Sequence, residues 1–176
     1  MSQIYQPKPD NRKYFDLIQH IKNGAIKIPK FQREFVWEKQ KTADLLDSIL
    51  KGYPIGTIII WKTKERLRSI KNLGNVDLPD TPDGDSVQYI LDGQQRLASL
   101  FLVREGLSLK KDNKDIDYKT IYINLDKDST DPENIVTIEK PDGTSITVHQ
   151  LLNEGAAFIA DNYPRDYLDL IDHYKK

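Results

Sequence analysis

The sequence of 176 residues contains no cysteine. Disulfides, thiolate zinc sites and cysteine nucleophiles are therefore excluded, and the composition fits a reducing cytoplasm. Long apolar runs are also missing, because the longest, "PIGTIIIW" at residues 54–61, is far shorter than the ~20 residues of a membrane-spanning helix. The N-terminal stretch "MSQIYQPKPD" lacks the apolar core of a secretory signal. We therefore expect a cytoplasmic protein without a membrane segment.

The chain also lacks an excess of charge of one sign. Its 26 lysines and arginines are balanced by 27 aspartates and glutamates, so the net charge is -1. Non-specific binding to nucleic acids depends on surplus positive charge, and contact with DNA would therefore have to come from a local patch. Hydrophobic residues make up 38% of the chain, enough for one core, and we expect residues 1–176 to form a single domain.

Several signatures of catalytic and metal sites are missing. The sequence has no G-x-x-x-x-G-K-[ST] motif, which excludes a P-loop. Its three histidines, His20, His149 and His173, lie far apart without companion ligands, so we expect no metal site. The segment "DLPDTPDGD" at residues 77–85 contains four aspartates, but their spacing differs from that of an EF-hand. A polar loop is therefore preferred to a calcium site.

Hydrophobic periodicity predicts a mixed α/β (α+β) fold. Helical spacing of apolar residues occurs in the segments 14–24, 38–51, 94–105 and from Pro164 onward. Strand patterns occupy residues 25–28, 57–61, 87–91 and 119–125, with a hairpin around 141–143 and a loop over 63–88. Residues 57–61 are apolar on both faces, which favours a central strand. We expect a small twisted mixed sheet centred on strands 57–61, 87–91 and 119–125 and flanked by the helices 38–51 and 94–105.

The most informative stretch is "YILDGQQRLASLF", residues 89–101. A strand that leads directly into a helix directs the first unpaired N–H groups of the helix at whatever lies beyond the strand, which creates an anion site. Asp92 can cap the helix, Gly93 allows close approach of the backbone, and Arg96 offers a forked cation to phosphate oxygens. Gln94 and Gln95 add neutral donors and acceptors. The alternative is that Asp92 is only a cap, Gly93 only a turn and Arg96 a solvated surface residue.

A second stretch, "IPKFQREFVW" at residues 28–37, carries aromatic residues in an irregular segment. Its aromatics would anchor the segment and leave the polar residues between them displayed. Arg33 could then join Arg96 at the helix N-terminus, and a pair of arginines there would suit a triphosphate. The alternative is that Phe35 and Trp37 belong to the core and that Arg33 makes a structural salt bridge with Asp92.

These two stretches resemble the N-terminal domain of the GmrSD family of restriction endonucleases, in which IPxFQRxxxW and DGQQRL segments are hallmarks. The resemblance covers residues 26–62 and 87–103. More distantly, the order of motifs resembles that of ParB partition proteins and sulfiredoxin, which implies a ParB/sulfiredoxin-like fold. In those relatives the G-x-x-R box, here Gly93 to Arg96, contacts phosphate.

The GmrSD resemblance implies roles for individual residues. Its DGQQR motif is associated with binding and hydrolysis of a nucleoside triphosphate, a step that licenses DNA cleavage. Phosphoryl transfer also requires neutralisation of charge, which backbone N–H groups, two arginines and Mg²⁺ could supply, so the expected cofactor is a nucleoside triphosphate with Mg²⁺. The nucleotide-binding set that the resemblance implies is Gln32, Arg33, Asp92, Gly93 and Arg96, and the catalytic set is Asp92, Gln94, Gln95 and Arg96. The family's nuclease chemistry resides in a C-terminal HNH domain that this sequence lacks. We therefore expect the chain to be the N-terminal piece of a longer protein.

The functional expectation is a domain that binds a nucleoside triphosphate, with hydrolysis as a further prediction, and that regulates a DNA-targeting restriction or phage-defence protein. The alternative is a ParB-like DNA- or protein-docking module without turnover. A third interpretation, direct nicking of DNA through Asp92 and a metal ion, requires a compact carboxylate cluster that the sequence does not offer.

Overall fold

The computed structural model describes residues 8–30, 35, 37–111 and 113–175 of the chain. Its N-terminal half contains a three-stranded sheet in the order β1 (Ile26–Lys27), β5 (Val87–Asp92) and β2 (Ile59–Thr63). The central strand β5 runs parallel to β1 and antiparallel to β2. Helix α1 (Tyr14–Lys22) packs against β1 and against α3 (Gln94–Glu105).

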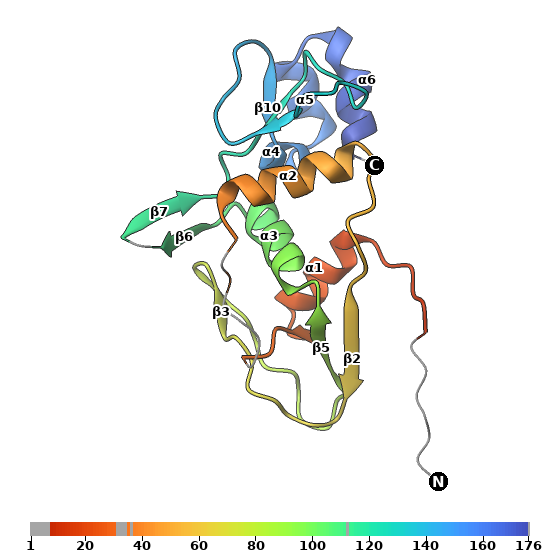
Figure 1. Cartoon of the computed structure of the whole chain (residues 1–176), viewed down its shortest axis with the longest axis vertical. Helices are drawn as coiled ribbons and strands as arrows, with labels where there is room; N and C mark the ends of the chain where they lie inside the picture. The colour runs from red at the N-terminus through yellow and green to blue at the C-terminus, as the bar shows by residue number, and fades with distance from the viewer. Residues whose placement is uncertain (1–7, 31–34, 36, 112, 176) are drawn as a thin grey trace.

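Helix α3 is the centre of the molecule (Figure 1). It contacts α1, α2 (Lys39–Leu50) and α4 (Val148–Asn153), and every residue from Leu97 to Val103 is buried. A helix that is enclosed on all sides needs apolar residues around its whole circumference. The sequence "LASLFLV" meets this need, and its one polar side chain, Ser99, accepts a hydrogen bond from the Thr42 hydroxyl of α2 at 3.1 Å.

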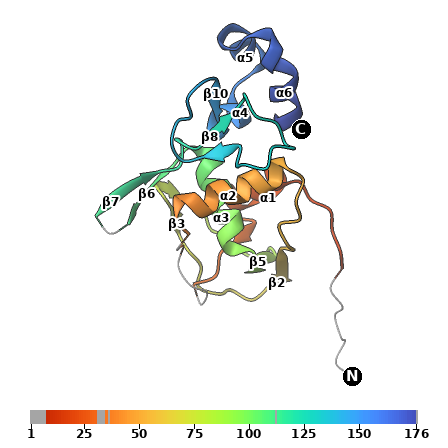
Figure 2. The same cartoon turned by 45° about the horizontal axis from the view of Figure 1, so that its top comes forward.

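The C-terminal half contains a second three-stranded sheet, in the order β10 (Ser145–Thr147), β8 (Tyr122–Asn124) and β9 (Val136–Thr137). Helix α4 follows β10 directly, and α5 (Ala156–Asn162) and α6 (Arg165–Lys175) complete this half. Both views place α2 and α3 between the two sheets (Figures 1 and 2). Helix α2 packs on α3 and on β9, so it joins the halves.

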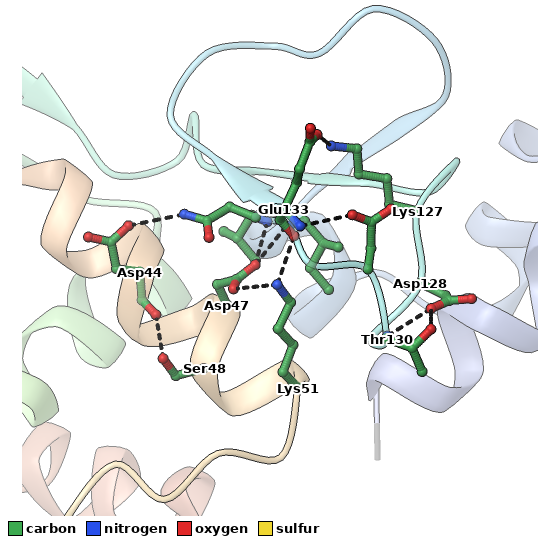
Figure 3. A network of polar contacts seen from close by, with 12 residues as sticks. Asp44, Asp47, Ser48, Lys51, Lys127, Asp128, Thr130 and Glu133 are labelled. Atoms are coloured by element: carbon green, nitrogen blue, oxygen red, sulfur yellow. Dashed lines mark hydrogen bonds and ion pairs between the residues drawn. The ribbon is translucent and has the colours of Figure 1, made fainter.

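A buried polar network fixes α2 to the C-terminal sheet (Figure 3). The carboxylate of Asp47 accepts hydrogen bonds from the backbone N–H groups of Ile135 at 2.7 Å and Val136 at 3.1 Å. Lys51 lies 3.1 Å from the same carboxylate and donates to the backbone carbonyl of Glu133 at 2.7 Å. The network therefore satisfies two backbone donors at the start of β9 and pairs its two charges.

The predicted helices are confirmed, and so is the mixed α/β class. The arrangement of the sheet was predicted wrongly in three respects. The strand near 119–125 lies in the second sheet, α2 packs mainly against α3 and β9, and β2 is an edge strand instead of a central one. Ile59 and Trp61 of β2 are 51% and 37% exposed. An apolar run predicts a strand but does not reveal whether both of its faces are covered.

Smaller features also differ from the prediction. The segment 63–88, predicted as a loop, contains the hairpin of β3 (Asn72–Leu73) and β4 (Val76–Asp77). The charged segment after α3 forms a hairpin of β6 (Ser108–Lys111) and β7 (Lys114–Asp117), neither of which was among the predicted strands. The strands on either side of residues 141–143 do not pair with each other, because β8 lies between them. Within the described parts of the chain, no helix combines the length and hydrophobicity needed to cross a membrane.

Candidate functional site

The DGQQR turn lies where β5 meets α3. Asp92 is the last residue of β5, and Gly93, the N-cap of α3, has a φ of 85°. A Cβ atom at position 93 would lie 2.9 Å from Cγ1 of Ile58, so this turn requires glycine both for its left-handed backbone and for space. The prediction that Asp92 caps α3 is wrong, because Gly93 occupies the cap position and the Asp92 carboxylate pairs with Arg96 at 3.1 Å.

Arg96 connects the turn to the loop that precedes β2. Its guanidinium donates to the backbone carbonyls of Ile55 and of Thr57, the latter at 2.7 Å, and to the carboxylate of Asp92. Gly56 lies between these two carbonyls with a φ of 83°, and a Cβ atom there would lie 2.7 Å from Nη1 of Arg96. The alternative of a solvated arginine on the outer surface is therefore wrong, since the side chain is 15% exposed and well bonded.

The two glutamines of the motif are buried, with 6% of Gln94 and 7% of Gln95 exposed. The side-chain oxygen of Gln95 accepts a hydrogen bond from the backbone N–H of Trp37 at 3.3 Å. A buried amide group needs partners, because leaving it unsatisfied costs about 1–3 kcal/mol. This contact shows that the end of the 28–37 segment lies against the DGQQR turn, as the sequence led us to expect.

Aromatic side chains hold the end of that segment in place. Phe35 and Trp37 are partly buried and pack on the hydrophobic core. The ring of Phe35 meets that of Tyr118 edge to face, with centroids 6.1 Å apart, and the Tyr118 hydroxyl donates to the backbone carbonyl of Trp37 at 3.3 Å. Burial raises the pKa of Tyr118 to about 12, so its hydroxyl remains a hydrogen-bond donor at neutral pH.

Residues 91–96 and Trp37 line a pocket of about 360 Å³. All five residues of the DGQQR motif therefore share one cavity, which offers a guanidinium, two amides and a carboxylate. Gln32 and Arg33, the other members of the predicted nucleotide-binding set, lie outside the described residues, and so does the hypothetical salt bridge between Arg33 and Asp92. The part of the chain that the structure describes contains no group of three or more metal-ligating side chains.

A phosphate group with Mg²⁺ would need a cation and a carboxylate, and the pocket offers one of each in Arg96 and Asp92. Asp92 is 60% exposed, so its carboxylate can serve as one ligand of a magnesium ion that keeps several water molecules, as Mg²⁺ usually does. Arg96 contributes a positive charge beside it, although part of its hydrogen-bonding capacity is used by the loop carbonyls. Sequence reasoning missed these loop contacts. Gly56, directly before an apolar strand, was the available signal that another group approaches the backbone there.

Comparison with known proteins relates the chain to a protein family and to an archaeal protein. The family model for the N-terminal domain of the GmrSD restriction endonuclease matches residues 14–173. A protein of Methanocaldococcus jannaschii described only as uncharacterized is 34% identical over 96 residues, which cover 52% of this chain. The matched region spans 17% of the length of that archaeal protein.

Proposed function

The chain belongs to the GmrSD restriction endonuclease N-terminal domain family, and we propose that it is a nucleotide-responsive regulatory domain of a DNA-targeting restriction or phage-defence protein. The observation that carries this proposal is the convergence of the whole DGQQR motif on one pocket. A site that binds phosphate and directs its hydrolysis needs positive charge, fixed dipoles and an oriented water more than a covalent nucleophile.

Each residue of the motif then has a role in the proposal. Arg96 neutralises phosphate charge, Gly93 lets the phosphate approach the backbone, and Asp92 holds Mg²⁺ or orients the attacking water. Gln94 and Gln95 position that water and support the neighbouring segment. Nucleoside triphosphate is the proposed ligand, and hydrolysis is the finer part of the proposal.

The contacts of Arg96 also offer a route by which an occupied pocket could affect the rest of the protein. Arg96 is bonded to the loop before β2 and to Asp92 at the same time. A phosphate group that competes for the guanidinium would weaken its bonds to Ile55 and Thr57. The loop before β2 is therefore the proposed element that changes when nucleotide binds, since a ligand shifts a conformation only through differential contacts.

A thermal-shift and phosphate-release series with ATP, GTP, CTP and UTP plus Mg²⁺ tests the proposal. We expect at least one nucleotide to raise the melting temperature of the wild type and to lose this effect in Arg96→Gln. Arg104→Gln is the matched control, because Arg104 lies in the last turn of the same helix and stacks 4.4 Å above the ring of Phe15. Phosphate release that depends on Arg96 would support hydrolysis. The absence of a shift with all four nucleotides would contradict the proposal.

A docking module without turnover is the second candidate. The observation that favours it is the use of Arg96 as a structural clamp between α3 and the loop before β2. In that case the isolated protein would bind DNA in a salt-dependent manner, would release no phosphate from any nucleotide, and would show the same melting temperature with and without nucleotide.

A further inference from the structure

A second pocket, of about 470 Å³, lies at the opposite end of β5 from the DGQQR turn. Tyr89 near the start of this strand lines it, whereas Leu91 and Asp92 at the end line the DGQQR pocket. We call this second pocket the basic groove, because five cations line it: Lys27, Lys30, Arg66, Arg68 and Lys71. Only two acidic residues, Asp80 and Asp83, are among its lining residues. The groove therefore carries a local positive surplus in a chain whose net charge is -1.

Backbone pairing brings two of these cations together. Pro29 forms an isolated antiparallel bridge with Ser69, the N–H of Ile70 donates to the carbonyl of Ile28, and the N–H of Lys30 donates to the carbonyl of Arg68, each at 2.8 Å. Lys30 and Arg68 are therefore directly opposite each other on adjacent segments. Within the described parts of the chain, neither side chain has an ion-pair or hydrogen-bond partner. Like charges placed opposite each other destabilise a pair of strands, so this arrangement is unfavourable for folding alone.

The other cations of the groove are held by protein contacts. Lys27 is 7% exposed and donates to the carbonyl of Pro79 at 2.9 Å, and it shares the carboxylate of Asp80 with Lys71. The two lysines hold the pKa of Asp80 below its usual range. Arg66 donates to the carbonyls of Pro82 and Asp85. These bonds fix the loop that forms one wall. Among the contacts of the described residues, they leave Lys30 and Arg68 as the two groove cations that are not held by a protein partner.

An aromatic surface lies beside the groove. Trp61 of the edge strand β2 is 37% exposed, and its ring centroid lies 6.3 Å from that of Tyr89. An exposed aromatic face next to a positively charged groove is the combination that binds single-stranded nucleic acid, where cations contact the backbone and aromatic rings stack on bases. An acidic peptide would use the cations but would gain little from the indole ring.

We propose that the basic groove binds the phosphate backbone of a nucleic-acid strand through Lys30 and Arg68, with Trp61 stacking on an unpaired base. This site goes beyond the proposed nucleotide function, because the DGQQR turn contributes no residue to it. Its position at the other end of β5 allows both sites to be occupied at the same time. The protein therefore has a specific local patch for DNA contact despite its nearly neutral total charge.

Fluorescence anisotropy of a labelled single-stranded oligonucleotide over a series of salt concentrations tests this proposal. The test variant is Lys30→Gln/Arg68→Gln. The matched control is Lys114→Gln/Lys140→Gln, which removes the same charge from two exposed lysines elsewhere. We expect the test variant to bind about tenfold or more weakly, with a salt slope smaller in magnitude by about 1.4, because two phosphate contacts are lost and each contributes about 0.7 on a single strand. The control should bind like the wild type. Trp61→Leu should lower the affinity for the single-stranded oligonucleotide by about fivefold or more, and it should lower the affinity for a duplex less, because paired bases cannot stack on the indole ring.

Three outcomes would overturn the proposal. These are unchanged binding in the test variant, an equal loss in the control, and displacement of the oligonucleotide by polyglutamate as readily as by unlabelled DNA. The melting temperature provides the folding readout, and relief of the like-charge pair should leave it unchanged or raised in the test variant. If nucleotide still raises the melting temperature of this variant, the DGQQR pocket functions independently of the basic groove. The two proposals can therefore fail independently, because one is tested by the nucleotide-dependent melting temperature and the other by oligonucleotide binding.

Discussion

Two ion pairs in this molecule have the same sequence spacing and different surroundings. Asp47 and Lys51 lie on α2, and Asp92 and Arg96 flank the start of α3. In each pair the acid precedes the base by four residues, and the charged atoms are 3.1 Å apart. The side chains of the first pair are 8% and 4% exposed, whereas Asp92 in the second is 60% exposed. Equal spacing therefore produces an enclosed structural pair in one place and an open carboxylate beside a pocket in the other.

The difference arises from what surrounds each carboxylate. The Asp47 carboxylate is enclosed by the backbone N–H groups that begin β9, so its bonding capacity is used within the fold (Figure 3). At the DGQQR turn it is the base that is enclosed, because the loop carbonyls before β2 surround Arg96. When one residue of an ion pair is buried, removing its partner lowers the stability of the protein strongly, since an unpaired buried charge is far more costly in free energy than an exposed one.

The largest expected effect follows from breaking the enclosed pair. Asp47→Ala would leave the buried ammonium of Lys51 without its carboxylate and two backbone donors without an acceptor. We expect the free energy of unfolding to fall by about 3–5 kcal/mol, as measured by urea denaturation. Asp44→Ala is the control, because Asp44 lies on the exposed face of the same helix and its hydrogen bonds from Gln40 at 2.8 Å and Asn134 at 3.5 Å are exposed to solvent. A substitution there should change stability by about 0.5 kcal/mol or less. Similar losses in both variants would contradict the assigned role of Asp47.

An intermediate effect on stability is expected when a substitution at another position moves the Arg96 side chain out of its place. Gly56→Ala forces a left-handed alanine and places its Cβ against the guanidinium, so we expect a loss of about 1–3 kcal/mol from backbone strain together with a weaker nucleotide-dependent thermal shift. Gly52→Ala is a close control, because Gly52 has a φ of 71° and open space around its Cβ position. It should lose stability through strain and keep the nucleotide effect. If nucleotide shifts the melting temperature equally in the two variants, Arg96 does not contribute to nucleotide binding.

The sequence predicted local features well because they depend on local periodicity. The bounds of α3 were predicted at 94–105, where the structure places them, since the apolar run is closed by Gly106 with a φ of 63°. The covering of β2 and the placement of β8 in a separate sheet depend on segments far away in the sequence. No period of two or of 3.6 residues contains that information. The ParB-like comparison stays a prediction, because the architecture confirms only the mixed α/β class.

The candidate site shows the same division between local and distant information. The turn at Gly93 and the meeting of the two motifs were predicted from their residues, and the contact between Gln95 and Trp37 confirms the second. The role of Asp92 as a helix cap was wrong, because Arg96, one turn later, competes for its carboxylate. The contacts of Arg96 with residues 55 and 57 could not be predicted, since they depend on how β2 enters the sheet.

The smallest expected effect on stability comes from the exposed carboxylate of the second ion pair, Asp92. Asp92→Asn removes the charge of a carboxylate that is 60% exposed, and we expect urea denaturation to show a loss within the ~0–1 kcal/mol typical of exposed ion pairs. Asp10→Asn is the matched control, because Asp10 is 59% exposed and pairs with Arg12. Both variants should fold like the wild type. Only Asp92→Asn should lose the part of the nucleotide-dependent thermal shift that requires Mg²⁺, because only this carboxylate lines the pocket. A Mg²⁺-dependent shift of wild-type size in Asp92→Asn would show that the metal ion has another ligand, and the open carboxylate would then have no more functional importance than Asp10.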